Sequence, residues 1–343
     1  MKTNNHLLNE MIQNVTHPID FSGVVYVKRG EETLANTAFG YADRAEKRLN
    51  TPDTRFGSAS GSKLFTVIGI AQLVDKGLIA FDTRLTDCLA IDFPNFDPAI
   101  TIHHLLTHTS GIPDYFDEEV MEDFEDLWKE RPVYQMTSPE DFLPLFQEGA
   151  MQFEPGERFH YNNAGFILLG LIIEEQTGRA FSDYIESEVF CKCGMSGSGY
   201  FELDQLPQNT ALGYIDEEED KAWRTNVYSI PKKGGADGGA FVTAPDMAKL
   251  WEALFNDTLL NEETTRELLT PRIQVNEAVH HGYGIWMNKK GEEVHKYHVM
   301  GYDPGVRFRA AYYPHSSLKI VVLSNAETEL FDLVQSIEEN LRV

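Results

Sequence analysis

Short hydrophobic runs near both ends of the chain have the length and the β-branched and aromatic content of β-strands. Residues 21–28 and 33–40 are two such runs, and the polar residues 29–32 between them predict a hairpin. Near the other end, residues 306–313 and 318–324 form a second pair around a turn that contains proline and two serines. We therefore expect antiparallel strands from both termini.

A further strand is predicted at residues 294–299, and a helix near residues 327–341 follows the last strand. The middle of the chain predicts helices instead. Residues 64–74 are apolar almost all round, which is typical of a buried helix, and residues 164–175 form a second apolar helix that Gly178 ends.

Strands at the two ends and helices between them predict an α+β fold, an antiparallel β-sheet flanked by helices with an inserted all-helical lobe. We expect residues 1–66 and 235–343 to form the sheet domain, and residues 67–234 to form a mainly helical lobe. A chain of 343 residues is long enough for two lobes that share a cleft.

The chain is strongly acidic, with 29 Lys and Arg against 54 Asp and Glu and a formal charge of −25. This charge repels phosphate backbones and anionic lipids, so neither nucleic acid nor a membrane is an expected partner. The N-terminal residues lack the apolar run of a signal peptide, and no later run is long enough to span a membrane. Three cysteines are too few for a disulfide framework, so we expect a cytoplasmic protein with free thiols.

Candidate chemistry begins at Ser60 and Lys63, which stand three residues apart at the predicted start of the first buried helix. This spacing places both side chains on one face of a helix. A serine hydroxyl needs an adjacent base to act as a nucleophile at neutral pH, and a desolvated lysine with a lowered pKa can be that base. Alone, the pair is better explained by a helix-capping serine and a surface lysine, and the other motifs reverse this preference.

The same spacing occurs in the segments 229–232 and 316–319, which context excludes. Pro231 disfavours a helix in the first segment, and the second lies in a predicted hairpin turn where its lysine would be solvated. Ser60 and Lys63 therefore remain the candidate pair.

Tyr161 and Asn163 form a Tyr-x-Asn pair in the turn that leads into the second apolar helix. A tyrosine can relay a proton if neighbouring cations lower its pKa, and an asparagine amide can both accept from a lysine and donate to a substrate. The alternative is a plain helix start capped by Asn163. With Ser60 and Lys63 upstream, we favour the functional interpretation.

These motifs resemble those of the serine β-lactamase and penicillin-binding protein superfamily, closest to class C β-lactamases and their D-peptidase and esterase relatives. The resemblance extends over nearly the whole chain through residues 21–25, 39–43, 102–113 and 238–246. It implies a β-lactamase/transpeptidase-like fold, an active site between two lobes, and no metal or organic cofactor. It also implies an acyl-enzyme on Ser60, with Lys63 and Tyr161 as proton-handling partners and Asn163 at the substrate.

The third element of that family is a Lys or His followed by Thr or Ser and Gly on the strand that borders the cleft. The local candidate lies in residues 298–305, where two registers compete. One places the triplet at residues 299–301, which end in Gly301, and the other begins at His298 and restores the cation. Only one of His298 and Val299 can face the cleft, because side chains alternate along a strand. The backbone N–H groups of Ser60 and Tyr302 are the expected oxyanion hole, which requires no particular side chain.

Other motifs receive structural interpretations. His104 and His108 have the spacing of a helical metal pair, but a turn follows directly, and we expect no metal site. The glycine-rich residues 234–239 lack a following Lys-Ser or Lys-Thr and predict a turn beside the cleft, while no Gly-x-Ser-x-Gly supports an α/β-hydrolase. The acidic residues 114–130 predict either a solvated surface or a lid over the cleft.

The function expected from these residues is that of a serine hydrolase which acts through Ser60 on an ester, an amide or a peptide with D-residues. The partner is thus a small-molecule or short-peptide acyl substrate, and the sequence makes no prediction of the oligomeric state. Without a cation at the third motif, a substrate carboxylate should be held poorly unless Arg307 or Arg309 replaces it, and both are expected on the outer sheet face. The alternative is a non-catalytic or slowly deacylating penicillin-binding or sensor protein.

Overall fold

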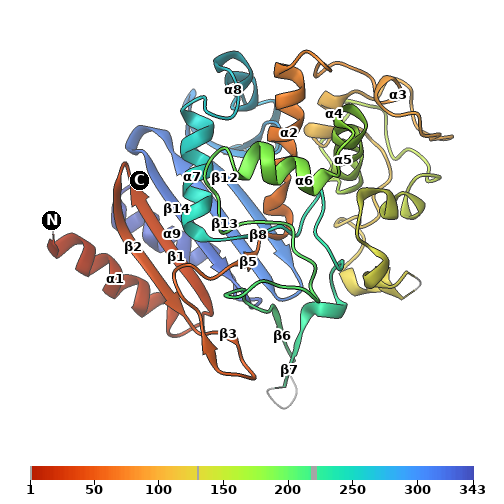
Figure 1. Ribbon diagram of the computed structural model, residues 1–343. Helices are drawn as coiled ribbons and strands as arrows, with labels where there is room; N and C mark the ends of the chain where they lie inside the picture. The colour runs from red at the N-terminus through yellow and green to blue at the C-terminus, as the bar shows by residue number, and fades with distance from the viewer. Residues whose placement is uncertain (1, 130, 218–221) are drawn as a thin grey trace.

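The computed structural model describes residues 2–129, 131–217 and 222–343, so residue 130 at the end of the acidic segment lies outside the described residues. Within the described residues, strands from both ends of the chain form one eight-stranded antiparallel sheet in the order β2-β1-β14-β13-β12-β11-β10-β9 (Figure 1). Its strands are β1 (Gly23–Arg29), β2 (Glu32–Phe39), β9 (Ile273–Gln274), β10 (Val279–His281), β11 (Trp286–Lys290), β12 (Glu293–Asp303), β13 (Val306–Tyr313) and β14 (Leu318–Ser324).

The α+β prediction is confirmed, and all five predicted strands are present within a few residues. Strand β12 continues past the predicted end at residue 299, because its ladder with β13 runs to the pair Asp303 and Val306 at the turn. This extension carries Gly301 and Tyr302 into the sheet.

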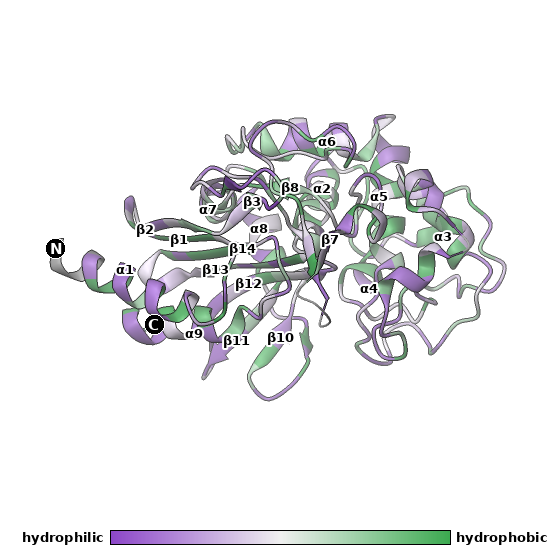
Figure 2. Ribbon diagram, turned by 90° about the horizontal axis from the view of Figure 1, so that it is seen from below, coloured by the Kyte–Doolittle hydropathy of each residue, from purple (hydrophilic) through white to green (hydrophobic). Residues whose placement is uncertain are grey.

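Helices cover both faces of the sheet (Figure 2). Helices α1 (Lys2–Thr16) and α9 (Phe331–Leu341) pack on one face through a separate hydrophobic cluster. Helices α2 (Lys63–Asp75) and α7 (Ala244–Phe255) pack on the other face. Among the described residues, every helix is too short or too polar to cross a bilayer. Helix α1 was not predicted, because only its Leu and Ile positions distinguish its polar sequence from a loop.

The remaining helices lie mostly beside the sheet, in the segment between residues 67 and 234. They are α3 (Leu85–Cys88), α4 (Ile102–Leu106), α5 (Ala164–Thr177) and α6 (Phe181–Ile185), with α8 (Glu262–Leu268) following α7. Short strand pairs accompany them: β3 (Tyr41–Asp43) with β4 (Arg48–Leu49), β5 (Phe56–Gly57) with β8 (Phe241–Val242), and β6 (Tyr214–Asp216) with β7 (Trp223–Thr225). Because β6, β7 and long loops fall inside it, this segment is not entirely helical.

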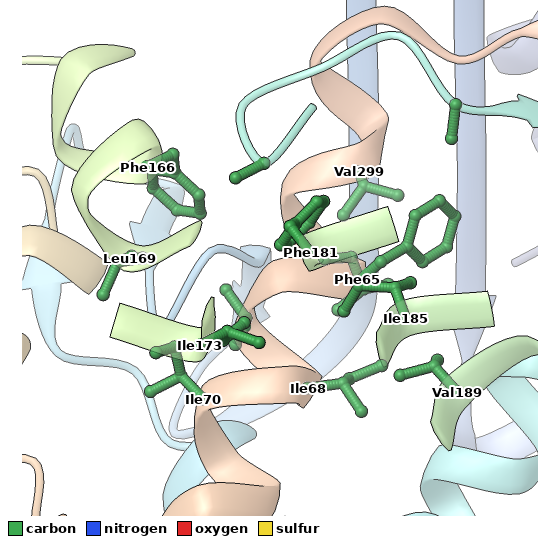
Figure 3. Close-up of a cluster of buried hydrophobic side chains, with 14 of the residues drawn as sticks. Phe65, Ile68, Ile70, Phe166, Leu169, Ile173, Phe181, Ile185, Val189 and Val299 are labelled. Atoms are coloured by element: carbon green, nitrogen blue, oxygen red, sulfur yellow. The ribbon is translucent and has the colours of Figure 1, made fainter. Parts of the chain in front are cut away.

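Helix α2 is buried, as its apolar sequence predicted, and its side chains pack against those of α5 and α6 (Figure 3). Phe65 and Ile68 are fully buried among side chains of α5 and α6, such as Ile173 and Ile185, and Val299 of β12 joins the same cluster. The helix therefore cannot shift without disrupting the core, and its first residue, Lys63, begins inside the protein.

A cluster of ion pairs ties α7 to the sheet. Glu252 lies 2.8 Å from the Nζ of Lys28 and accepts a hydrogen bond of 2.7 Å from Lys319, whose exposed fraction is 3%. Burial raises the pKa of Glu252, but the bonds to the two lysines outweigh it and hold the pKa below its usual value.

We predict that Glu252→Gln lowers the free energy of unfolding by about 3 kcal/mol near pH 7, because a lysine is left buried without its partner. A carboxyl with a depressed folded pKa contributes stability above its unfolded pKa and loses it as the pH falls through the folded pKa. Urea unfolding should therefore show the difference shrinking below about pH 4.5. Glu31→Gln, which removes an exposed partner of Lys28, is the control and should change stability little. An unchanged urea midpoint in Glu252→Gln would show that α7 is held by apolar packing alone.

Candidate active site

The nucleophile candidate Ser60 lies in the short 3₁₀ helix η1 (Ala59–Ser62), directly before α2. Its predecessor Ala59 has a φ of +44°, in the left-handed region that non-glycine residues rarely adopt. Buried hydrogen bonds hold this turn, because the hydroxyl of Ser58 donates to the carbonyl of Ala240 (2.8 Å) and Ser62 Oγ accepts from the Ala240 N–H (3.0 Å). Ser60 is thereby presented to the cavity while its serine neighbours are buried.

The ammonium group of Lys63 is buried and has a hydrogen-bond acceptor for each of its three N–H groups. It donates to Ser60 Oγ at 3.0 Å, to Asn163 Oδ1 at 2.8 Å and to the carbonyl of Asp237 at 2.6 Å. Burial lowers the pKa of Lys63, but Tyr161, which becomes negative when its phenol ionises, and the charge of Asp237 outweigh this effect and leave the pKa above its usual value. The expectation of a lowered lysine pKa is therefore wrong for the free protein, which carries Lys63 as an ammonium.

Tyr161 lies beside Ser60 and Lys63. The Nζ of Lys63 is 5.0 Å from the centre of the tyrosine ring, and the ring of His108 stacks on it at 4.5 Å. Burial raises the pKa of Tyr161, and the positive charge of Lys63 offsets only part of this effect. In the free protein the phenol therefore keeps its proton.

Asn163 is oriented by Asp114, a residue that the sequence did not single out. The Asp114 carboxylate accepts from the backbone N–H of Asn163 (2.7 Å), from its side-chain amide (3.2 Å) and from the N–H of Ala164 (2.9 Å). It thus caps helix α5 from another segment and turns Asn163 Oδ1 towards Lys63. Burial raises the pKa of Asp114 to about 7. In the sequence, the feature that could have drawn attention to Asp114 is its position directly after the predicted turn at residues 109–113.

The structure distinguishes the two registers of the third motif. A Cβ atom on Gly301 would lie 2.3 Å from the carbonyl oxygen of Ser58, so β12 approaches η1 closely enough to require glycine. Val299, on the same face of the strand, is buried in the core, whereas His298 lies on the other face and is paired across the sheet with Trp286. Burial lowers the pKa of His298 well below its usual value, so it is neutral. His298 does not line the cavity at Ser60, and the expected cation is not supplied from this position.

The cavity beside Ser60 has a volume of about 950 Å³ and brings together the remaining candidates. Tyr161, Asn163, Gly301 and Tyr302 all line it. The acidic segment forms one wall through residues 115–125, which supports the lid interpretation, and the predicted glycine-rich turn forms another part. The side chain of Tyr302 points to Arg309, so only its backbone is available for the oxyanion role, which stays a prediction.

The other sequence candidates have structural partners. His103 Nδ1 contacts the hydroxyl of Tyr283 at 3.0 Å, and His104 caps the start of α4 with Thr101. Over residues 2–129, 131–217 and 222–343, no group of three ligating side chains has the geometry of a metal site.

Arg307 lines the cavity, contrary to its expected place on the outer face. Its guanidinium donates to the backbone carbonyls of Asp303 and Val306 at 2.9 Å and lies 3.9 Å from Glu327. Much of its bonding capacity is therefore already used within the protein.

The family model described as Beta-lactamase matches residues 11–339 of the chain. A penicillin-binding protein from Bacillus halodurans, known from its crystal structure, is 52% identical, with a TM-score of 0.92 over 96% of this chain and 99% of that one. Penicillin-binding protein 4* of Bacillus subtilis (strain 168) is 26% identical over 94% of this chain and 72% of its own length. The D-amino acid amidase from Ochrobactrum anthropi SV3, solved with D-phenylalanine, has a TM-score of 0.80 at 23% identity, over 98% of this chain and 99% of that one, and shows a shared fold.

We predict that Gly301→Ala lowers kcat/KM for an activated ester by about 100-fold, because the added methyl group forces β12 away from η1 and displaces Ser60. The free energy of unfolding should fall by only about 1–3 kcal/mol, so that the variant still folds. Ester hydrolysis and urea unfolding measure the two effects. Full activity at unchanged stability would show that the close contact does not position Ser60.

Proposed function

The chain belongs to the beta-lactamase family, and on this premise we propose that it is a serine hydrolase that forms an acyl-enzyme on Ser60. The observation that carries the proposal is the 3.0 Å hydrogen bond between Lys63 Nζ and Ser60 Oγ, with both groups at the cavity end of a buried helix. Among the residues that the structure describes, the hydrogen-bond partners of this buried lysine are a hydroxyl, an amide and a carbonyl, and none is a carboxylate. A purely structural role would favour an ion pair instead.

Acylation begins when Ser60 Oγ attacks the substrate carbonyl and its proton passes to the pair formed by Lys63 and Tyr161. The free protein carries a proton on both groups, so one proton must leave the pair before either can accept another. The backbone N–H groups of Ser60 and Tyr302 stabilise the oxyanion, and the proton from the pair then goes to the leaving group. A water molecule hydrolyses the ester on Ser60 by the same steps and frees the serine.

The proposed substrates are small acyl compounds: esters, amides or short peptides with D-residues. A cavity of about 950 Å³ accommodates a ligand of this size. We place the protein in the cytoplasm, where an ester or a small peptide is the first choice.

A second candidate is a protein that is acylated but deacylates slowly, and so acts as a penicillin-binding or sensor protein. Val299 favours this candidate, because it fills the position at which the resembled family has a cation. A burst of product equal to the enzyme concentration, followed by a slow steady rate, would identify it.

We predict that intact-protein mass spectrometry after brief exposure to an activated ester or a penicillin detects one acyl group on Ser60. Ser60→Ala should lose the adduct and lower ester hydrolysis by several orders of magnitude, because the substitution removes the proposed nucleophile. Its urea unfolding should change little, since the hydroxyl contributes little packing. An adduct on another residue, or hydrolysis retained in Ser60→Ala, would contradict the nucleophile assignment.

We predict that kcat/KM for a neutral ester rises about tenfold per pH unit through the neutral range, because acylation requires loss of one proton from the pair. Both pKa values are raised, so the curve should bend only near or above pH 10. Burial raises the carboxyl pKa values of Asp114 and Asp303 to about 7, so these two groups should add a shallow inflection to the curve near pH 7. A flat profile between pH 6 and 9 would contradict the raised pKa values.

A further inference from the structure

We propose that His108 is a positioning residue, which holds the phenol of Tyr161 beside Ser60 and Lys63 for proton transfer. The inference rests on the proposed function, because Tyr161 handles a proton only if Ser60 is acylated. His108 is one of the two histidines whose spacing is that of a helical metal pair. In the structure its side chain is buried against Tyr161 and is not part of the cavity wall, so it acts through the tyrosine and not on the substrate.

Three successive residues of the turn before α5 are held by this one histidine. The N–H of His160 donates to the backbone carbonyl of His108 at 2.8 Å, and the N–H of Asn162 donates to its Nδ1 atom at 3.0 Å. Between these two bonds, the ring of Tyr161 stacks on the imidazole, with the ring centres 4.5 Å apart and the planes inclined by 29°. A backbone bond, a side-chain bond and a ring contact therefore fix the turn around the phenol.

The imidazole suits this place because it combines a flat ring with a hydrogen-bond acceptor. A phenyl ring would stack on Tyr161 but would leave the buried N–H of Asn162 without an acceptor, and a smaller amide would accept from this N–H without offering a ring. Burial keeps the ring neutral, because it lowers the pKa of His108 well below its usual value. Since Nδ1 accepts from Asn162, the proton of the neutral ring is on Nε2.

His108 is itself held by the interior of the protein. Its ring stacks on Phe166 of α5 at 5.1 Å and contacts His281 of β10 at 5.0 Å, and both of these side chains are buried. Tyr161 therefore packs on a ring that the core supports, while Lys63 begins the buried helix α2. A misplacement of about 1 Å can slow an enzyme roughly 100-fold, so this support has a kinetic consequence.

The position of His108 also has costs that packing alone does not require. Its φ is +56°, in the left-handed region that glycine and asparagine adopt more readily. Within the described parts of the chain, no group accepts a hydrogen bond from the buried Nε2 atom, and an unmade bond of this kind destabilises the folded protein. Strained and unsatisfied groups of this kind cluster at functional sites, and the contact with Tyr161 accounts for this one.

Two substitutions separate the ring contact from the hydrogen bond. His108→Asn places an amide oxygen near the Nδ1 position and suits the φ of +56°, but it removes the ring that packs on Tyr161. His108→Phe keeps a ring but removes the acceptor of the Asn162 N–H, so it should unfold at a lower urea concentration than His108→Asn. For an activated ester we expect kcat/KM to fall about 30-fold in His108→Asn and by less than about tenfold in His108→Phe. A merely structural role would make the less stable variant the less active one.

A double-mutant cycle shows whether the effect passes through the phenol. In a Tyr161→Phe background, His108→Asn should change kcat/KM by less than about threefold, because the hydroxyl that the histidine positions is absent. The control is His104→Asn, which removes the cap of α4 and should lower the urea midpoint while kcat/KM stays within about twofold of the wild type. Wild-type activity in His108→Asn, or equal losses with and without the Tyr161 hydroxyl, would overturn the inference and leave the proposed function standing.

The position of Tyr161 can also be measured without turnover. If no ester is hydrolysed through Ser60, the proposed function fails, and NMR of the protein with ¹³C-labelled tyrosine rings then tests the inference alone. The signals of Tyr161 are those that Tyr161→Phe removes. The stacked ring of His108 should shift them upfield, and His108→Asn should abolish this shift while His104→Asn retains it. Tyr161 signals that are the same in all three proteins would overturn the inference.

Discussion

The burial of one ammonium group, that of Lys63, is the constraint on which the site depends. An ammonium removed from water is destabilising by several kcal/mol unless each N–H finds an acceptor. The three acceptors are Ser60 in η1, Asn163 at the start of α5 and the backbone of Asp237 in the glycine-rich turn, which lie up to 174 residues from Lys63 in the sequence. The hydrogen bonds of one side chain therefore fix the relative positions of three segments, all of which line the cavity.

A second constraint, the close approach of β12 to η1, acts on the same serine. Gly301 leaves room for the backbone of residues 58–61, and the strained φ of Ala59 is maintained by the hydrogen bonds of the buried serines to Ala240. The strain and the glycine are two consequences of one requirement, that the nucleophile project into the cavity from a turn which the sheet supports.

Hydrophobic periodicity was sufficient to predict the sheet from both termini, the buried helix α2 and the apolar helix α5, because these elements are stabilised by the burial that the pattern records. The expectation that Ser60, Lys63, Tyr161 and Asn163 lie together also followed from their two motifs and from the order of these motifs along the chain. The direction of the Lys63 pKa shift did not, because it depends also on Asp237, whose proximity to Lys63 no local pattern encodes. Alternation along β12 allowed either His298 or Val299 to face the cleft, and only the close approach of Gly301 to Ser58 decides between the two registers.

The same burial that positions Lys63 also determines the charge of the cleft. The lysine needs neighbouring negative charge to remain an ammonium, and Asp237 and Glu118 provide it, but they and Asp303 then repel one another around a single cation. Val299 packs into the core where a cation would otherwise offset this excess, and Arg307 is directed to carbonyls and Glu327. The negative charge left in the cavity is thus a consequence of how the buried lysine is stabilised.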